Sequence, residues 1–399
     1  MTLFTDLAMA PADPILGVTD LFKADTRVDK ANLGVGVYQD SSGKLPLMEC
    51  VRQSEARLTA NPQPYNYLPI DGNADYDALV GRLVLGPDHP VVVAGRVVTV
   101  QTLGGSGALK VGGDFLRGLG VTTVLLSDPT WDNHAAIFGG CGLNLGRYRY
   151  YDEANRRIDV DGMLDDLRAA EPGTVVVLHG CCHNPTGYDL TVDQWNQVLD
   201  VVSAGRLTPF IDMAYQGLAV DPDADAYAIR EAARRGLPAL CANSFSKIFG
   251  LYGERVGGLT LVTASADEAK RVRSQVKLKV RANYSNPPTH GSAIVNAILS
   301  DAVLRAEWAQ EVSAMRDRIR LMRQKLADGL RAEGVTQDVS YITAQRGMFS
   351  YSGLTKAQMV RLREEFGVYG VENGRLCVAA LNDNNIVHVS HAMATVMQS

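Results

Sequence analysis

The sequence predicts an α/β protein in which a mainly parallel sheet lies between helices and a smaller α+β domain follows. Three observations favour this fold. Short β-branched runs alternate with helical stretches between about residues 90 and 262, as in parallel sheets with helical crossovers. A long amphipathic helix is expected at about 301–333. The chain has 399 residues, more than the roughly 250–300 at which a single core stops growing.

The predicted organisation begins with an extended arm at residues 1–14. We expect a large domain over 48–309 and a small domain over 310–399, with 15–47 joining the small domain. The long helix would connect the two domains.

Strands of the sheet are predicted where short apolar runs occur, at 96–101, 121–126, 174–179, 208–212 and 259–263. Ligands of parallel sheets bind off the carboxyl ends of the strands. Four of the runs are followed closely by polar, aromatic or glycine residues: Gly104 to Ser106, Asp128 to His134, His183 to Gly187 and Asp212 to Gln216. One shared crevice would explain all four segments.

Composition excludes several classes of partner. A net charge of −5 argues against a nucleic-acid or anionic-membrane surface. The N-terminus has no signal-peptide pattern, and no apolar run approaches the ~18 residues of a membrane span. Six cysteines without regular spacing suggest reduced thiols. We therefore expect a soluble cytoplasmic protein that binds neither nucleic acid nor membrane.

Two loops invite a ligand interpretation. Gly104, Gly105 and Ser106 lie between a strand and a helix start, where backbone N–H groups bind phosphate. The spacing fits no Walker A or GxGxxG pattern, so a plain tight turn is an equal alternative. His179 and His183 flank two cysteines in HGCCHNPTG, but this spacing matches no tetrahedral zinc site. We predict packed cysteines there and no metal.

The sharpest feature is Lys247 in NSFSKIFGLYGERVGG, surrounded by small and aromatic residues. A desolvated lysine near other cations has the lowered pKa that imine chemistry requires. Ser244 and Arg255 suit a phosphate group. Asp212 and Tyr215 add a carboxylate and a phenol at a strand end, although Asp212 alone is equally typical of a helix cap. Together these residues indicate pyridoxal phosphate.

Ten motifs extend this interpretation to a family. In chain order they are LGVGVYQD, NYLPIDG, LGGSGALK, SDPTWDNH, CCHNPTG, IDMAYQG, NSFSKIFGLYGERVGG, VRANYSNPP, GMFSYSGL and LREEFGVYGVENGR. From about Asp13 to the C-terminal helix, the chain resembles the pyridoxal-phosphate aminotransferases of the aspartate/aromatic class (fold type I). It is most similar to bacterial aromatic-amino-acid (tyrosine) aminotransferases. The resemblance implies a seven-stranded, mainly parallel sheet in the large domain.

The resemblance also implies roles for the cofactor residues. Lys247 would form the imine, Asp212 would pair with the pyridine nitrogen, and His134 would support Asp212. Tyr215 and Asn184 would bind the 3-oxygen of the cofactor. Lys247, Asp212 and Tyr215 are thus the expected catalytic residues. The remaining cofactor contacts would be Trp131 at the ring and Gly104, Gly105, Ser106, Ser244 and Arg255 at the phosphate.

For the substrate, the resemblance implies two arginine clamps. Arg375 would bind the α-carboxylate, and Arg281 of a neighbouring subunit would bind the side-chain carboxylate of a dicarboxylic substrate. Tyr67 would reach the phosphate in the neighbour's site, so a homodimer with shared active sites is expected. The other expected substrate contacts are Gly36, Trp131 and Asn184.

The expected reaction is transfer of the amino group from tyrosine, phenylalanine, tryptophan or aspartate to 2-oxoglutarate by a ping-pong mechanism. Ser106 and Leu45 resemble the aromatic enzymes, whereas Val37, Asn66 and Asn286 resemble the aspartate enzymes. The alternative is therefore an aspartate aminotransferase with little aromatic activity.

Two further classes are disfavoured. Arg281 and Arg375 argue against a decarboxylase, lyase or racemase on the same fold, because a pair of carboxylate clamps suits dicarboxylic partners. A non-catalytic binding module would be expected to lack Lys247, Asp212 or Arg375, and all three are present.

Overall fold

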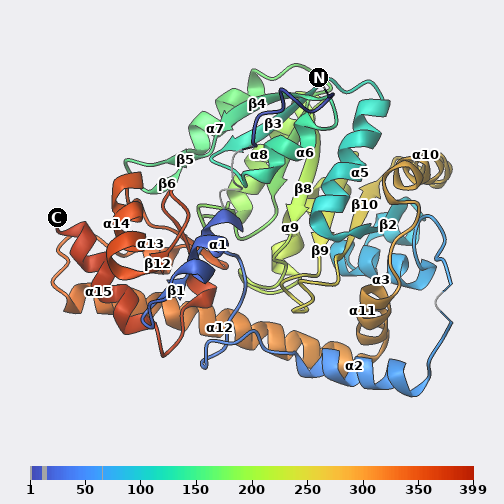
Figure 1. The fold of residues 1–399 in the computed structure, drawn as a ribbon. Helices are drawn as coiled ribbons and strands as arrows, with labels where there is room; N and C mark the ends of the chain where they lie inside the picture. The colour runs from blue at the N-terminus through green and yellow to red at the C-terminus, as the bar shows by residue number, and fades with distance from the viewer. Residues whose placement is uncertain (1, 11–15, 65) are drawn as a thin grey trace.

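A seven-stranded sheet forms the centre of the computed structural model, which describes residues 2–10, 16–64 and 66–399 (Figure 1). In spatial order the strands are β2 (Val97–Leu103), β10 (Val256–Val262), β9 (Ala239–Ser244), β8 (Thr208–Met213), β7 (Val175–His179), β3 (Thr123–Asp128) and β4 (Asn144–Arg149). Every neighbouring pair is parallel except those of β10, which is antiparallel to both β2 and β9. The expected mainly parallel, seven-stranded sheet is confirmed.

Two of these strands, β4 and β9, are absent from the strands expected from the sequence. The β4 segment NLGRYR is an edge strand with mostly exposed side chains. The β9 segment ALCANS is fully buried but contains no β-branched residue. Neither segment carries the β-branched apolar run that marks the other strands. The pattern is absent from β4 because most of its side chains face solvent at the edge of the sheet. In β9 the neighbouring strands and helices bury the segment whatever its β-propensity.

Helices cover both faces of the sheet. Alternate residues of β7 face opposite sides, so that Val175 and Val177 pack with α5 (Gly104–Gly118) and α10 (Ala266–Tyr284), whereas Val176 and Leu178 pack on the other side. The remaining helices of this larger body are α2 (Glu49–Ala60), α3 (Ala74–Leu85), α4 (Pro90–Val93), α6 (Asn133–Gly139), α7 (Val160–Arg168), α8 (Val192–Ala204), α9 (Tyr227–Arg234) and α11 (His290–Ser300). Burial on both faces explains the continuous apolar runs of the inner strands.

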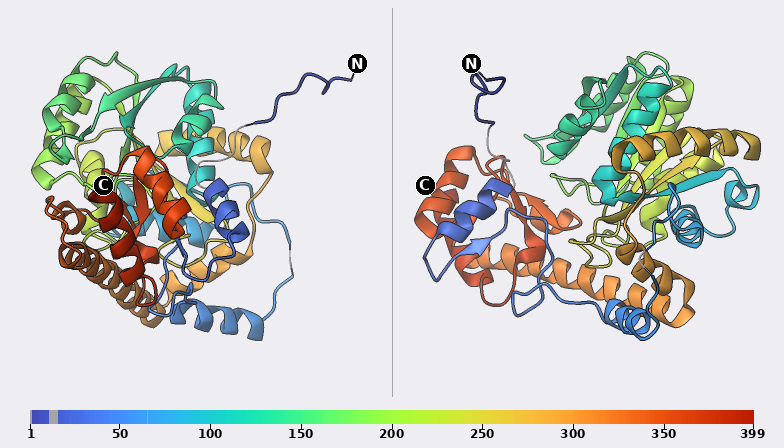
Figure 2. Two further views of the ribbon diagram at one scale, coloured as in Figure 1. Left: turned by 60° about the vertical axis from the view of Figure 1, so that its left-hand side comes forward. Right: turned by 45° about the vertical axis from the view of Figure 1, so that its right-hand side comes forward.

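A smaller body contains the C-terminal elements. These are α13 (Tyr341–Ala344), α14 (Lys356–Phe366), α15 (Ile386–Met397), β11 (Phe349–Tyr351), β12 (Val368–Tyr369) and β13 (Arg375–Cys377). Strand β1 (Ala31–Asn32) pairs in parallel with β12, so that α1 (Leu16–Ala24) and β1 lie beside these elements (Figure 2). A short hairpin of β5 (Tyr151–Asp152) and β6 (Arg157–Ile158) completes the strands of the described residues.

The long helix α12 (Ala302–Ala332) connects the two bodies. It contacts α11 and α2 at one end and α15 at the other. Asp301 caps its start, because its Oδ1 accepts hydrogen bonds from the backbone nitrogens of Val303 and Leu304 at 2.8 and 3.0 Å. The boundaries at residues 47 and 309 stay predictions, and residues 1 and 11–14 of the expected arm lie outside the described residues.

No helix within the described ranges is both long and apolar enough to cross a membrane.

Candidate active site

A cavity of about 170 Å³ opens at the carboxyl ends of β2, β8 and β9. Its lining residues are Gly105, Ser106, Trp131, Asn184, Asp212, Ala214, Tyr215, Ser244, Ser246, Lys247 and Arg255. The structure therefore brings most of the expected cofactor residues to one place. Ala214 and Ser246 are additional lining residues, each adjacent in sequence to an expected one.

Lys247 reaches the cavity from the hairpin between the antiparallel strands β9 and β10. The backbone nitrogen of Phe245 donates to the carbonyl of Val256 at 3.1 Å, so Lys247 and Arg255 return to the same edge of the sheet. The pKa of the Lys247 amine is lowered to about 8, mainly by burial, with Asp212 acting in the opposite direction and Arg255 and Arg375 adding to the decrease. Such an amine is partly unprotonated near neutral pH and can act as a nucleophile and a base.

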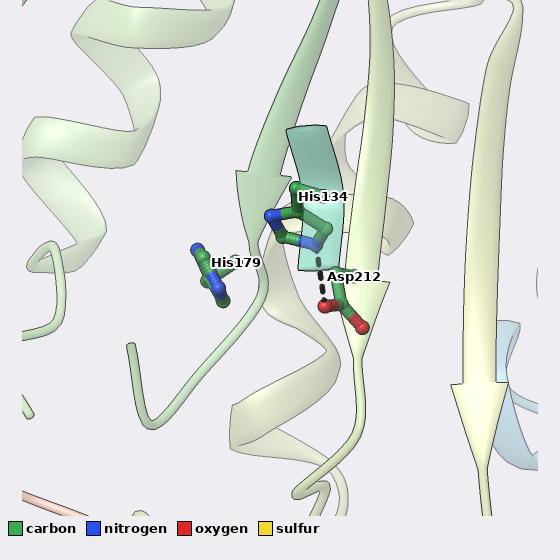
Figure 3. A group of neighbouring side chains, drawn as sticks. All are labelled: His134, His179 and Asp212. Carbon is green, nitrogen blue, oxygen red and sulfur yellow. Dashed lines mark hydrogen bonds and ion pairs between the residues drawn. The ribbon is translucent and has the colours of Figure 1, made fainter. Parts of the chain in front are cut away.

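Asp212, which lines the cavity, forms a buried pair with His134 (Figure 3). His134 Nε2 lies 3.1 Å from Asp212 Oδ2, and His134 Nδ1 lies 2.8 Å from the hydroxyl oxygen of Thr130. Burial acts to raise the pKa of Asp212, but the hydrogen bond with His134 and the charges nearby outweigh it and hold the pKa below its usual value. Asp212 is therefore ionised and can stabilise a protonated ring nitrogen.

His179 lies beside this pair, with its ring centroid 5.2 Å from that of His134 (Figure 3). Burial, together with His134, lowers the pKa of His179 to about 3, so the ring is neutral. Ligand atoms of His134, His179 and Asp212 lie within 4.8 Å of one another, a spacing that a metal ion could bridge. His134 Nε2 is directed at Asp212 Oδ2 and so is not free to bind a metal ion in this arrangement. The ionised carboxylate of Asp212, held by His134, is equally suited to bind the protonated ring nitrogen of a heterocycle.

The start of α5 and the hairpin form an anion cradle. Gly104 has a φ of +64°, and a Cβ at this position would lie 2.7 Å from Arg255 Nη2. A Cβ at Gly105 would lie 3.2 Å from the Cβ of Ser244. Glycine is thus needed for the close approach of the helix start to Ser244 and Arg255. No side chain caps the first turn of α5, so its backbone N–H groups can bind a phosphate along with Ser106.

Arg375 is 3% exposed and is held beside the cavity by two hydrogen bonds. Its Nη1 donates to Asn184 Oδ1 at 3.1 Å, and its Nη2 donates to the carbonyl of Gly34 at 2.7 Å. Its Nε has no hydrogen-bond partner among the residues that the structure describes. A buried guanidinium with an unfilled donor and no carboxylate partner is suited to receive a carboxylate.

Phe349 packs under this arginine, with its ring centroid 4.3 Å from the Arg375 guanidinium carbon. A Cβ at Gly36 would lie 2.6 Å from the Phe349 ring, so Gly36 permits the packing. The sequence pattern does not identify Phe349 as a site residue, and neither does it identify Thr130. Both lie within the motifs SDPTWDNH and GMFSYSGL, but the motifs assign them no role, because each acts through a contact with another site residue that only the fold reveals.

Two expected site residues do not line the cavity of their own chain. Arg281 is an exposed residue near the end of α10 and hydrogen-bonds to Ser285. Tyr67 is 85% exposed and lies in a separate open cavity of about 630 Å³, which Asn286 and Arg255 also line. Arg255 thus borders both cavities. Within one chain, Arg281 and Tyr67 are available to a neighbouring molecule.

Comparisons with known proteins point in one direction. The family model described as "Aminotransferase class I and II" matches residues 28–393. An aspartate aminotransferase of Pseudomonas aeruginosa is 51% identical over all of both chains, and an aromatic-amino-acid aminotransferase of Escherichia coli is 49% identical over 99% of this chain and 100% of the relative. The crystal structure of an aromatic-amino-acid aminotransferase from Burkholderia pseudomallei, covalently bound to pyridoxal phosphate, is 56% identical. The match covers 99% of this chain and 100% of that one, with a TM-score of 0.97.

Proposed function

The chain belongs to the class I and II aminotransferases, as its motifs predict, and from this premise we propose that it is a pyridoxal-phosphate-dependent transaminase for aromatic amino acids and aspartate. One observation carries the proposal. A lysine with a lowered pKa, an ionised aspartate and an anion cradle meet in one cavity. Pyridoxal phosphate presents the matching groups, which are a carbonyl, a ring nitrogen and a phosphate.

The residues present fit this cofactor. The phosphate would be held by Ser244, Arg255 and the start of α5, and the ring nitrogen by Asp212. Asn184 and Tyr215 line the same cavity and would contact the 3-oxygen, with Trp131 against the ring. When bound, the cofactor supplies an electron-withdrawing ring that stabilises negative charge at the substrate Cα.

The protein's own contribution is orientation and proton transfer. Arg375 would bind the α-carboxylate of the amino acid in a bidentate fork and thereby direct the Cα–H bond towards Lys247. The Lys247 amine would then remove the proton from Cα as a general base and return it as a general acid in the reverse direction. Lys247 Nζ lies 5.3 Å from the centroid of the Tyr215 ring, and both residues line the cavity in which the proton would be transferred.

Aminotransferase substrates are amino acids and 2-oxo acids, and we propose 2-oxoglutarate as the acceptor. Support for a mixed donor range comes from relatives of similar identity that are named for aspartate and for aromatic amino acids. The sequence supports the same mixed range, because two residues resemble the aromatic enzymes (Ser106 and Leu45) and three resemble the aspartate enzymes (Val37, Asn66 and Asn286). The second candidate, an aspartate aminotransferase with little aromatic activity, is favoured by the name of the relative from Pseudomonas aeruginosa.

We also propose a homodimer in which each active site uses Arg281 and Tyr67 of the other subunit, because both side chains are exposed in one chain. A mixing experiment tests it. Lys247→Ala protein, which lacks the catalytic amine, and Arg281→Ala protein, whose activity with aspartate is lowered, would be refolded together and assayed with aspartate. A shared site predicts that roughly a quarter of the sites regain both residues in random hybrid dimers. Activity equal to the sum of the two separate variants would contradict the proposal.

A cytoplasmic location is the further expectation. It is supported by the six cysteines, which are all buried free thiols and so suit a reducing compartment.

The function is tested by absorbance and by kinetics. The purified holoenzyme should be yellow, and adding aspartate or tyrosine should convert its spectrum to that of the amino form of the cofactor. Steady-state rates with aspartate, tyrosine and phenylalanine against 2-oxoglutarate then separate the two candidate donor ranges. A protein that takes up no pyridoxal phosphate would refute the proposed function.

A further inference from the structure

A second cavity, of about 350 Å³, lies between α12 and the loops around residues 218 and 345. Four arginines line it: Arg316, Arg320, Arg323 and Arg346. No aspartate or glutamate is among its lining residues in the part of the chain that the structure describes. None of the cationic groups of the active site, Lys247, Arg255 and Arg375, belongs to this cavity.

Three of the arginines project from one face of α12. Positions 316, 320 and 323 are separated by four and three residues, the spacing that places side chains one above another on a helix. Arg316 Nη1 donates to the carbonyl of Gly217 at 3.1 Å, and Arg320 Nη2 donates to the carbonyl of Ala219 at 2.7 Å. These bonds use only part of the five donors of each guanidinium and fix its position.

Arg323 forms the floor of this set and is 2% exposed. Its Nη atoms donate to the carbonyls of Ile342, Gly347 and Phe349 at 2.5–2.9 Å. Burial lowers its pKa to about 10, and no carboxylate pairs with it among the described residues. Its Nε, like that of Arg316, has no hydrogen-bond partner within the same residues. Unsatisfied buried donors are costly, and a bound acceptor would satisfy them.

The acidic groups near the cavity do not neutralise it. Asp317 lies 3.7 Å from both Arg316 Nε and Arg320 Nη1, so one carboxylate is shared by two guanidinium groups. Asp189 borders the adjacent cavity that Arg346 also lines. Its carboxylate already accepts hydrogen bonds from the backbone nitrogens of Cys182 and His183 at 2.8 and 2.9 Å. Among the described residues that line this cavity, the positive charge is therefore not balanced by any carboxylate.

We propose that this cavity, the arginine pocket, binds a small oxyanion with two or more negative charges, as in a polycarboxylate or a phosphorylated metabolite. Guanidinium groups pair with carboxylate and phosphate in the same bidentate geometry, so the pocket recognises the shared oxyanion chemistry. Its volume lies within the range of small-molecule sites and is far below that of a macromolecular surface.

The experiment is titration calorimetry on the holoenzyme at low ionic strength. Pyrophosphate and citrate serve as separate probes, so the two arms distinguish a phosphorylated from a polycarboxylate ligand. The test variant is Arg320→Gln/Arg346→Gln, because both side chains are exposed at the mouth of the pocket. Arg323 is left in place, since it also holds the carbonyl of Phe349 in the substrate site.

The matched control is Arg305→Gln, which removes an exposed arginine of the same helix that does not line the pocket. We expect one probe to bind the wild type and the control alike, and Kd to rise at least about tenfold in the test variant. Turnover of amino acids should be unchanged in both proteins. Absence of binding to the wild type, or equal Kd in the test variant, would overturn the proposal. Binding is measured without turnover, so this result is independent of the proposed function.

Discussion

The cofactor side and the substrate side of the candidate active site are built differently. Lys247, Asp212 and the anion cradle occupy strand ends and a helix start of one buried sheet. On the substrate side, Arg375 comes from the smaller body, whereas Arg281 is exposed on α10. The groups that transfer the proton are thus positioned by the central sheet. The groups that select the substrate come from the smaller body and from α10. Four predictions test this contrast.

The largest effect is expected at the centre of the cofactor side. Lys247→Ala removes the base and the covalent contact, so kcat should fall by about 10⁴-fold or more. The anion cradle is separate from this side chain, and the variant should still bind pyridoxal phosphate. Absorbance and steady-state rates measure the two properties. Near-normal turnover would refute the role of Lys247.

On the substrate side, Arg375→Ala should lower kcat/KM by about 10²–10³-fold for every amino donor. The reason is that all amino acids share the α-carboxylate. Because Arg375 also bonds to Asn184 and Gly34, the thermal midpoint should be measured as a check on folding. A loss confined to aspartate would contradict this assignment.

Arg281→Ala should have a smaller and selective effect. We expect kcat/KM for aspartate to fall by about 10–10²-fold, since only the side-chain carboxylate loses its charged partner while Arg375 still binds the α-carboxylate. Rates with tyrosine and phenylalanine should change little. Equal losses with aspartate and tyrosine would place Arg281 outside the recognition of the side chain.

The smallest effect concerns pH. In the cofactor-free protein, a small amine-reactive reagent should modify Lys247 at a rate that rises with pH and levels off above the lysine's pKa of about 8. Ordinary lysines continue to gain reactivity up to about pH 10.4. Asp212→Asn removes the charge that favours the ammonium, so the plateau should move to lower pH. Mass spectrometry of the Lys247 peptide gives both rates, and an upward move would contradict the stated electrostatics.

The same contrast separates what the sequence could and could not predict. The cofactor side is encoded in short motifs, because Ser244, Lys247 and Arg255 belong to one hairpin and Gly104 begins a helix directly after a strand. Phe349 lies in the motif GMFSYSGL, but the motif does not show its role, which depends on packing against Arg375 and Gly36. The composition of β9, ALCANS, does not indicate a strand, because the segment is buried by its neighbours in the sheet and contains no β-branched residue.

The direction of β10 has a consequence for how the chain tolerates change. Parallel neighbours need a long crossover, and such connections accept insertions readily. Because β9 and β10 are antiparallel neighbours, the single connection 245–255 sets the separation between Lys247 and Arg255. An added residue there would alter the spacing between the covalent contact and the phosphate contact. Deep insertion scanning should therefore find residues 245–255 intolerant, while the connections at the amino ends of the parallel strands, on the sheet edge away from the cavity, accept length variation.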